Sequence, residues 1–289
     1  MHRRRFIGAA VGAAGIVLSS RAAAEPFEIV YPRIRNGGDV HAAFALATLD
    51  VAMKAANATC TTRQADVVME RGRALAELAT GNTINLHWTS MDAQAERNLN
   101  AVHIPIHRGL IGYRIFLIRR ERQPEFAKVQ TLDDLRALTA GQGLSWVDTL
   151  VLRNVGLKVQ TATYENLFGM LEAGRIDYYP RGVIEAFAEA DAHRDDAPHL
   201  TVEQHLLLTY RSDFLFYVTP AQPRLAETIA RGFAAAYRDG SYMRLFNTHP
   251  YIQNGLRQAR IAERRVIQLD NPYLSDADRT IPGVYWMGG

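Results

Sequence analysis

The sequence contains a single cysteine, Cys60, among its 289 residues. One thiol excludes an intramolecular disulfide, so the fold must be stabilised by the burial of apolar side chains. Long apolar runs are also missing. The apolar stretch near the amino terminus extends only from Ile7 to Ser20, too short for a membrane-spanning helix, which needs about 20 residues. We therefore expect a protein built on one large core or two medium ones.

Signatures of common catalytic and cofactor sites are absent too. The sequence has no G-x-S-x-G elbow, no Walker loop and no dinucleotide fingerprint. His103 and His107 have the i, i+4 spacing of helical metal ligands, but Pro105 between them opposes a helix and no third ligand is indicated. We predict no metal, no cofactor and no catalytic residue, and we expect Cys60 to be a small buried side chain.

The chain has almost no net charge when residues 1–24 are left out of the count. The chain has 33 Lys+Arg against 30 Asp+Glu, and four of the arginines lie within residues 1–24, which leaves 29 basic against 30 acidic side chains. A near-neutral chain lacks the positive field that attracts nucleic acid, so no nucleic-acid partner is predicted.

Residues 1–24 have the composition of an export signal. Arginines follow His2, a Gly/Ala-rich apolar segment comes next, and an A-x-A sequence ends at Ala24. We predict cleavage after Ala24 and export, to the periplasm or beyond. The Arg-Arg-x-Phe-Ile start is similar to the twin-arginine signal, although His2 stands where that signal usually has Ser or Thr, and the general secretory route stays open.

From residue 25 onwards, strand-like and helix-like patterns alternate. The predicted strands cover 27–32, 84–88, 112–118, 143–146, 158–161, 175–179 and 214–218, and the predicted helices include 40–56, 64–79 and 224–237. Thr131 with Asp134 predicts a helix N-cap, and 263–289 is predicted to pack as an extended strap. The alternation is typical of an α/β fold with mostly parallel, helix-covered sheets.

Several of these segments, taken in order, resemble one known family. They are TLDDL (131–135), WVD (146–148), MLEAGRID (170–177), FLFYV (214–218), LAE (225–227) and YRDGSY (237–242). The chain is similar over nearly all of its length after the leader to the type II periplasmic solute-binding proteins, especially the amino-acid-type, family 3-like binders. The resemblance implies two lobes, each a mostly parallel sheet flanked by helices, with lobe one formed by 25–118 and 212–289 and lobe two by 119–211. A ligand would lie in the cleft between them and be enclosed by hinge closure.

In such a fold, ligands lie at the carboxyl ends of strands and at helix N-termini. The residues predicted to bind the ligand are Tyr31, Trp88, Thr89, Ser90, Arg97, Arg114, Ser145, Trp146, Asp148, Thr149, Tyr179, Arg181 and Glu185. The resemblance implies that Arg97 holds a ligand carboxylate through paired hydrogen bonds, while a surface pair with Asp92 or Glu96 is the alternative. Arg114, on an apolar strand, needs either the ligand or a buried acid as its partner.

The remaining predicted residues have alternatives as well. Trp88 and Trp146 are expected either to face each other across the cleft or to close the edge of a core. Asp148 has helix capping as its alternative role. Amino-acid binders carry an acid for the ligand ammonium shortly after the segment 175–177, whereas this sequence has Arg181 there and its next acid at Glu185. Unless Glu185 reaches back, this departure favours an anionic ligand such as a carboxylate.

These features together predict an exported, non-catalytic and monomeric solute-binding protein that captures a small polar or anionic ligand for an ABC-type transporter. One alternative is an enzyme of the same fold that acts on cyclohexadienyl acids, with Glu185 or Asp148 as the general acid. The other is a sensor or scaffold module that binds a membrane partner.

Overall fold

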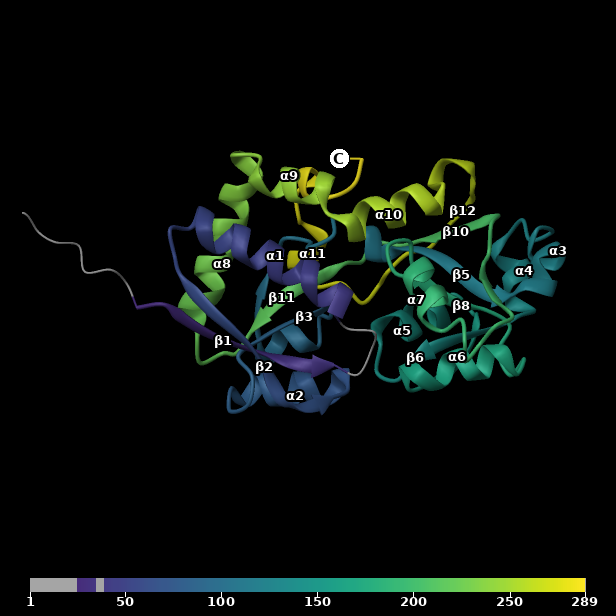
Figure 1. Cartoon of the computed structure of the whole chain (residues 1–289), viewed down its shortest axis with the longest axis horizontal. Helices are drawn as coiled ribbons and strands as arrows, with labels where there is room; N and C mark the ends of the chain where they lie inside the picture. Colours follow the sequence, from purple (N-terminus) through teal and green to yellow (C-terminus); the bar gives the residue numbers. More distant parts are fainter. Residues whose placement is uncertain (1–24, 35–38, 289) are drawn as a thin grey trace, which may run out of the picture.

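The computed structural model describes residues 25–34 and 39–288, and the predicted export signal lies outside them. Figure 1 shows two α/β halves side by side along the longest axis. The left half contains β1 (Phe27–Ile34), β2 (Cys60–Met69), β3 (Leu86–Ser90), β4 (Asn100–Val102), β11 (Phe214–Val218), α1 (Asp39–Ala55), α2 (Arg71–Thr80), α8 (Pro223–Arg238), α9 (Ser241–Thr248) and α11 (Asp276–Arg279).

The right half is formed mainly by the middle of the chain. It contains β5 (Tyr113–Arg119), β6 (Thr139–Gly143), β7 (Lys158–Ala162), β8 (Tyr179–Gly182), β9 (Leu200–Val202), β10 (Leu206–Thr209), β12 (Arg265–Gln268), α3 (Gln123–Phe126), α4 (Leu132–Arg136), α5 (Val147–Asn154), α6 (Tyr164–Glu172) and α7 (Ala186–Ala192). Helix α10 (Pro250–Ala259) contacts α9 of the left half and α7 of the right half. Among the described residues, no helix is long and apolar enough to cross a membrane.

Two small sheets build the left half. Strand β11 pairs antiparallel with β3 and β4, and β1 pairs in parallel with β2. The predicted helix 64–79 is wrong over residues 64–69, which belong to β2, and α2 begins only at Arg71. Val67 and Val68 favour extended backbone, but both are exposed. Because only Ala65 and Met69 of this strand are buried, its apolar pattern is too sparse to distinguish a strand from a helix.

Strand β5 is the centre of the right half. It pairs antiparallel with β8, β9 and β10, and β12 adds in parallel to β10. The parallel pair β6 and β7 forms a separate sheet, and an isolated bridge between Ala140 and Tyr178 places it beside the sheet of β5 and β8. The α/β class is therefore confirmed, but the sheets are mixed rather than mostly parallel, because β5 and β11 run antiparallel to the strands they pair with.

The pairing of two strands differs from the predicted lobe bounds. Those bounds place residues 113–118 and 265–268 in lobe one, whereas β5 and β12 lie in the sheet of the right half. Ile115, Phe116, Leu117 and Ile118 are all buried, so β5 needs packing on both of its faces, as a central strand obtains. The division of the chain into two lobes otherwise stays a prediction.

Local predictions hold unevenly in the right half. Thr131 and Asp134 form the predicted capping box at the start of α4. The predicted strand 143–146 is displaced, because β6 ends at Gly143 and Trp146 is already the N-cap of α5. The predicted strand 175–179 is displaced as well, since β8 begins at Tyr179. The predicted strap 263–289 contains β12 and α11.

The core is continuous across the two halves. Its largest apolar cluster includes Phe44 of α1 and Phe233 of α8 in the left half, and Leu167 and Phe168 of α6 in the right half. Helices α1 and α8 pack against each other in the left half, where Gly232 of α8 lies so close to α1 that an added Cβ would be 2.0 Å from the carbonyl oxygen of Ala52. This shared core holds the two walls of the cleft described next.

Candidate functional site

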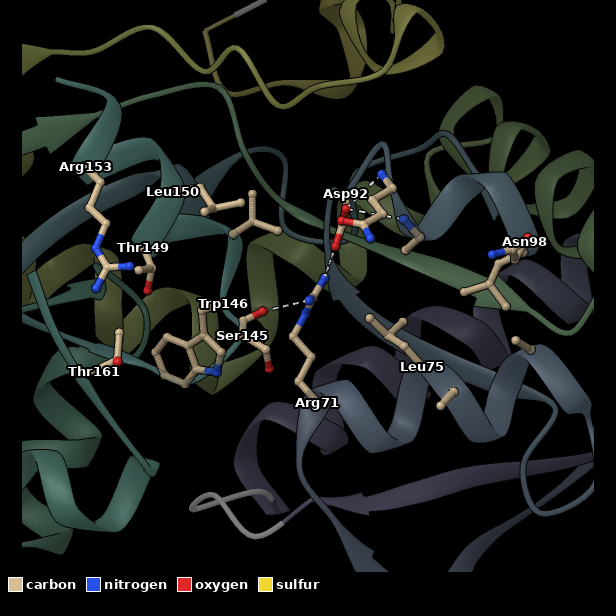
Figure 2. A pocket seen from close by; sticks show the side chains of 16 residues that line it. Arg71, Leu75, Asp92, Asn98, Ser145, Trp146, Thr149, Leu150, Arg153 and Thr161 are labelled. Carbon is tan, nitrogen blue, oxygen red and sulfur yellow. Dashed lines mark hydrogen bonds and ion pairs between the residues drawn. The ribbon is translucent and has the colours of Figure 1, made fainter.

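A cavity of about 580 Å³ lies where the two halves face each other. The left half lines it with Arg71, Leu75, Ala76, Ala79, Asp92, Gln94, Ala95, Asn98 and Leu99, and the right half with Ser145, Trp146, Val147, Thr149, Leu150, Arg153 and Thr161. Figure 2 shows these two sets on opposite sides, with Arg71 reaching from one to the other. We call this cavity the cleft. Its volume is within the range of pockets that hold small molecules.

Arg71 joins the two walls of the cleft. It is the first residue of α2, and its Nη1 donates to the main-chain oxygen of Ser145 in the right half over 2.8 Å. Its Nε donates to Thr89 Oγ1 over 2.9 Å. Its Nη2 donates to Asp92 Oδ2 over 2.8 Å (Figure 2). Asp92 is itself held by the backbone N–H of Gln94, which donates to Oδ1 over 2.9 Å. The guanidinium is therefore fixed by the left half and presented to the right half.

The right wall is the turn between β6 and α5. Ser145 has φ 59, and Trp146 caps α5 with extended backbone. The Trp146 indole stacks on Tyr179, with ring centroids 6.5 Å apart, and lies 5.0 Å from the Arg181 guanidinium carbon. A Cβ at Gly143 would be 2.1 Å from the indole, so only glycine allows this packing. The turn thus presents one aromatic face and the start of a helix to the cleft.

A buried network of charged side chains lies in the right half. Arg114 Nη2 donates to Asp148, which also accepts from the Tyr210 hydroxyl, and Arg114 Nη1 lies 3.4 Å from Glu185 Oε2. Arg181 donates to both oxygens of Glu189 over 2.6 Å. We call this set the arginine–acid network; its members are Arg114, Arg181, Asp148, Glu185 and Glu189. It contains one more acid than arginines.

Burial would favour uncharged groups in this network, but the ion pairs counteract it. Burial opposes the charged form of Arg114, yet the nearby Asp148, Tyr210 and Glu185 raise the pKa of Arg114 overall. Arg181 is affected in the same way, since burial opposes its charge while Glu185 and Glu189 raise its pKa. Both arginines therefore keep their charge and hold the carboxylates in place.

The structure brings three of the predicted residues into the cleft. Ser145, Trp146 and Thr149 line it. Five others belong to the arginine–acid network or stand against it, and none of these lines the cleft: Arg114, Asp148, Tyr179, Arg181 and Glu185. The ligand-binding roles of all of these residues remain predictions.

The predicted residues of the left half lie apart from the cavity. The rings of Tyr31 and Trp88 contact each other at a tilt of 40°, with centroids 5.3 Å apart, and Thr89 accepts from Arg71 Nε without lining the cleft. Ser90 is buried. Arg97 lies exposed on the short 3-10 helix η1 (Ala95–Asn98), and among the described residues it forms no ion pair with Asp92 or Glu96.

These contacts show the partners that three of the predicted residues have inside the protein. Arg114 has buried acids as its partners, so it does not need a ligand to be neutralised. Asp148 does not act as an N-cap, since Trp146 occupies that position and the Asp148 carboxylate accepts from Arg114 instead. Glu185 Oε2 accepts from the N–H of Gly182 over 2.7 Å, and Glu185 contacts both arginines without lining the cleft.

Sequence reasoning missed Arg71, Asp92 and Arg153. Arg71 lies in the middle of the helix predicted over 64–79, where it would be one more solvent-facing arginine, whereas it is the first residue of α2. Arg153 is in the last turn of α5, and its Nη2 donates to the main-chain oxygen of Val159 over 3.0 Å. Arg71 can be placed at the start of α2 once β2 is known to end at Met69. The sequence does not indicate that end, because Val67 and Val68 are exposed and give no strand pattern.

Comparison with known proteins identifies solved structures that have a similar fold. No protein-family model matches the chain, and no curated protein matches its sequence. Solved structures do match. A periplasmic binding protein of Salmonella typhimurium with high arginine specificity is 12% identical, with a TM-score of 0.55, over 76% of this chain and 98% of that one.

Two further solved structures have other roles. A histidine kinase sensor domain with similarity to periplasmic binding proteins is 15% identical, with a TM-score of 0.56, over 76% of this chain and 94% of the other. An ancestral amino-acid-binding protein, a precursor of cyclohexadienyl dehydratase, is 11% identical, with a TM-score of 0.54, over the same shares of the two chains. The chain therefore has the two-lobed fold of the periplasmic binding proteins, as its sequence predicts, and at these identities the likeness concerns the fold alone.

Proposed function

We propose that this chain is an exported, non-catalytic, monomeric solute-binding protein that captures a small polar solute carrying a carboxylate. The observation that carries the proposal is the cleft of about 580 Å³ with one wall from each half and a contact from Arg71 to Ser145 between the walls. A cavity lined from both sides closes around its ligand when the halves approach. The hydrogen bond from Arg71 to Ser145 also stabilises the closed arrangement of the halves relative to an open one.

The chemistry of the cleft supports an acid as the ligand. Its charged lining residues are Arg71, Arg153 and Asp92. Arg71 and Asp92 neutralise each other, whereas Arg153 forms no ion pair among the described residues. Its guanidinium is free to pair with a carboxylate. Thr149 and Thr161 offer hydroxyls beside it, and Trp146 and Leu150 provide apolar surface (Figure 2).

This argument for an anion replaces the one based on Arg181. Arg181 is held by both oxygens of Glu189 and lies 3.2 Å from Glu185, so its charge is already balanced inside the protein. The arginine–acid network would repel an anion rather than attract it, because its acids are in excess. The preference for a carboxylate therefore depends on Arg153.

Export and delivery to an ABC-type transporter are further parts of the proposal. They are supported by the leader-like composition of residues 1–24 and by the fold, which is shared with the substrate-binding protein of an amino acid ABC transporter at a TM-score of 0.51 and 13% identity.

The proposal of a binding protein rather than an enzyme has its own support. Glu185 and Asp148 are the acids that the sequence offers for a dehydratase, and neither lines the cleft. Both are nearly buried and contact Arg114. A general acid must reach its substrate, directly or through one water. In this geometry neither carboxylate does.

Ligand screening tests the proposal. We expect organic acids or amino acids to raise the melting temperature of the purified protein by mass action, while amines and neutral sugars do not. Arg153→Met should weaken the ligand so identified by roughly tenfold to a hundredfold, the loss of one charged hydrogen bond. Arg136→Met is the matched control, because Arg136 contacts Val155 just after α5 but does not line the cleft.

The same screen can overturn the proposal in distinct ways. Stabilisation by amines or sugars alone would contradict the carboxylate, and equal affinity in the Arg153 and Arg136 variants would contradict the role of Arg153. Turnover of a cyclohexadienyl acid, followed by its change in absorbance, would show an enzyme. A protein stabilised by none of these classes would be no solute-binding protein of this kind.

A further inference from the structure

Three side chains of types that can bind metals meet in the left half, outside the cleft, two of them within residues 96–103 and the third distant in sequence. They are Glu96 of η1, His103 just after β4, and Asp278 of α11. His103 Nδ1 lies 3.0 Å from Asp278 Oδ1, and His103 Nε2 lies 4.0 Å from Glu96 Oε2. One ligand atom from each residue can be chosen so that all three lie within 4.8 Å of one another.

Both carboxylates of this cluster have bonding capacity left over. Asp278 is completely buried, and its Oδ2 has no hydrogen-bond partner among the described residues. Glu96 Oε1 is buried and equally without a partner in the described part of the chain. A buried carboxylate oxygen without a donor is costly, since its solvation by water is lost and not replaced.

No fixed positive charge compensates these acids. Across residues 25–34 and 39–288, neither Glu96 nor Asp278 forms an ion pair with a lysine or arginine. Arg211 also contacts α11, but its guanidinium donates to the main-chain oxygens of Asp278 and Ile281 and lies over the Trp286 ring. Burial raises the pKa of Glu96 to about 7. A hydrogen bond with the Ser275 side chain and the nearby His103 counteract that rise, and the charge of Asp278 adds to it.

We propose that Glu96, His103 and Asp278 bind one divalent transition-metal ion of the Zn²⁺ class. One imidazole nitrogen with two carboxylates suits such an ion, whereas Ca²⁺ and Mg²⁺ prefer oxygen ligands alone. Ligand atoms bound tetrahedrally at about 2.1 Å lie about 3.4 Å apart, so side-chain movements of roughly 1 to 1.5 Å in total close the site. Three protein ligands leave a coordination position for water.

The ion would join the carboxyl-terminal segment to a wall of the cleft. Asp278 belongs to α11, close to the end of the chain, and Glu96 belongs to η1. Ala95 and Asn98, on either side of Glu96 in the same short helix, line the cleft. Binding of the ion therefore fixes η1 through Glu96, while Ala95 and Asn98 of the same helix line the cleft. The proposal uses no residue of the cleft itself, so it stands or falls separately from the proposed solute.

Zinc titration of the metal-free full chain tests the site. We expect ZnCl₂ at a hundredfold excess over its Kd to raise the melting temperature by roughly 5 °C or more, and CaCl₂ or MgCl₂ to have little effect. His103→Gln and Glu96→Gln should each weaken zinc at least about tenfold in calorimetry. The matched control is His199→Gln, because His199 also pairs with a carboxylate, that of Glu172, but is exposed and lies outside this cluster.

Hydrogen exchange locates the ion independently of any variant. In the unmodified protein, zinc should slow amide exchange over residues 94–103 and 275–281, the segments that supply the ligands. Zinc binding that leaves these segments unchanged would overturn the proposal. So would a protein that zinc does not stabilise, or equal zinc affinity in the His103, Glu96 and His199 variants, even if one of them unfolds more easily.

Discussion

The two halves of the molecule pair their buried acids with different side chains. In the right half the partners are arginines: Arg114 with Asp148, Arg181 with Glu189, and Arg264 with Glu203 at 3.6 Å. In the left half they are histidines: His107 with Asp213 at 3.0 Å, and His103 with Asp278. An arginine keeps its charge at every pH at which proteins fold, whereas a histidine changes charge near neutrality. The right half is thus expected to be less sensitive to pH than the left half, where a hydrogen bond with Asp278 raises the pKa of His103 and burial lowers that of His87.

The largest predicted effect is the loss of stability when one buried arginine of the right half is replaced. Arg114→Met leaves Asp148 without its guanidinium inside a buried site, and we expect a loss of about 3–5 kcal/mol in the free energy of unfolding. Urea denaturation followed by circular dichroism measures it. Arg194→Met is the control, because Arg194 and Asp191 are both exposed and should contribute less than about 1 kcal/mol. Similar losses in the two variants would contradict the role assigned to burial.

A buried histidine should make one large contribution to the pH response of the left half, in the direction opposite to that of Glu96. Burial, with a smaller contribution from Arg71, lowers the pKa of His87 from 6.5 to about 3. The unfolded chain therefore binds a proton at a pH where the folded chain does not, so the stability that is complete above about pH 6.5 falls as the pH drops toward 3. We expect a loss of about 2 kcal/mol between pH 7.5 and pH 5 from this group alone.

His87→Leu should remove that part of the pH dependence. His87 Nδ1 has no hydrogen-bond partner in the described part of the chain, so the variant gives up no bond to it. Urea denaturation at the two pH values measures the difference, and His199→Leu, at an exposed histidine, should leave it unchanged. An unaltered pH dependence in His87→Leu would assign the response to other groups.

The smallest effect concerns the contact between the halves. Arg71→Met removes the hydrogen bond to Ser145 and should shift the balance between closed and open halves by about 1.5 kcal/mol toward open. Small-angle scattering should then give a larger radius of gyration. Arg73→Met is the control on the same helix, since Arg73 is exposed and lies 3.8 Å from Glu77. A radius equal to that of the control would mean that Arg71 does not hold the halves together.

Local patterns predicted the strands and caps that depend on neighbouring residues. β11 is found at the predicted residues 214–218, and the Thr131 cap is found with its Asp134 partner. Each is encoded within a few residues, by continuous apolar side chains or by a capping sequence. β2 was missed because its partner β1 is distant in sequence and its own side chains are mostly exposed.

The candidate site was predictable only in part, because it depends on which charges pair. The sequence identifies Arg114 and Arg181 as charges that need partners, but Asp148 and Glu189 become those partners only through the packing of α5 and α7 against β5 and β8. The same holds for Asp278, which meets His103 across 175 positions of sequence. The sequence indicates that a buried charge needs a partner, but the identity of that partner depends on the tertiary structure.

The pairing of β12 with β10 has a consequence for the order of synthesis. A ribosome delivers β5, β8, β9 and β10 long before residues 265–268. Until then one edge of β10 has no neighbour and presents free backbone groups to any other extended chain. The right half of a nascent molecule is therefore exposed to mispairing over the time needed to translate β11 and the helices α8, α9 and α10.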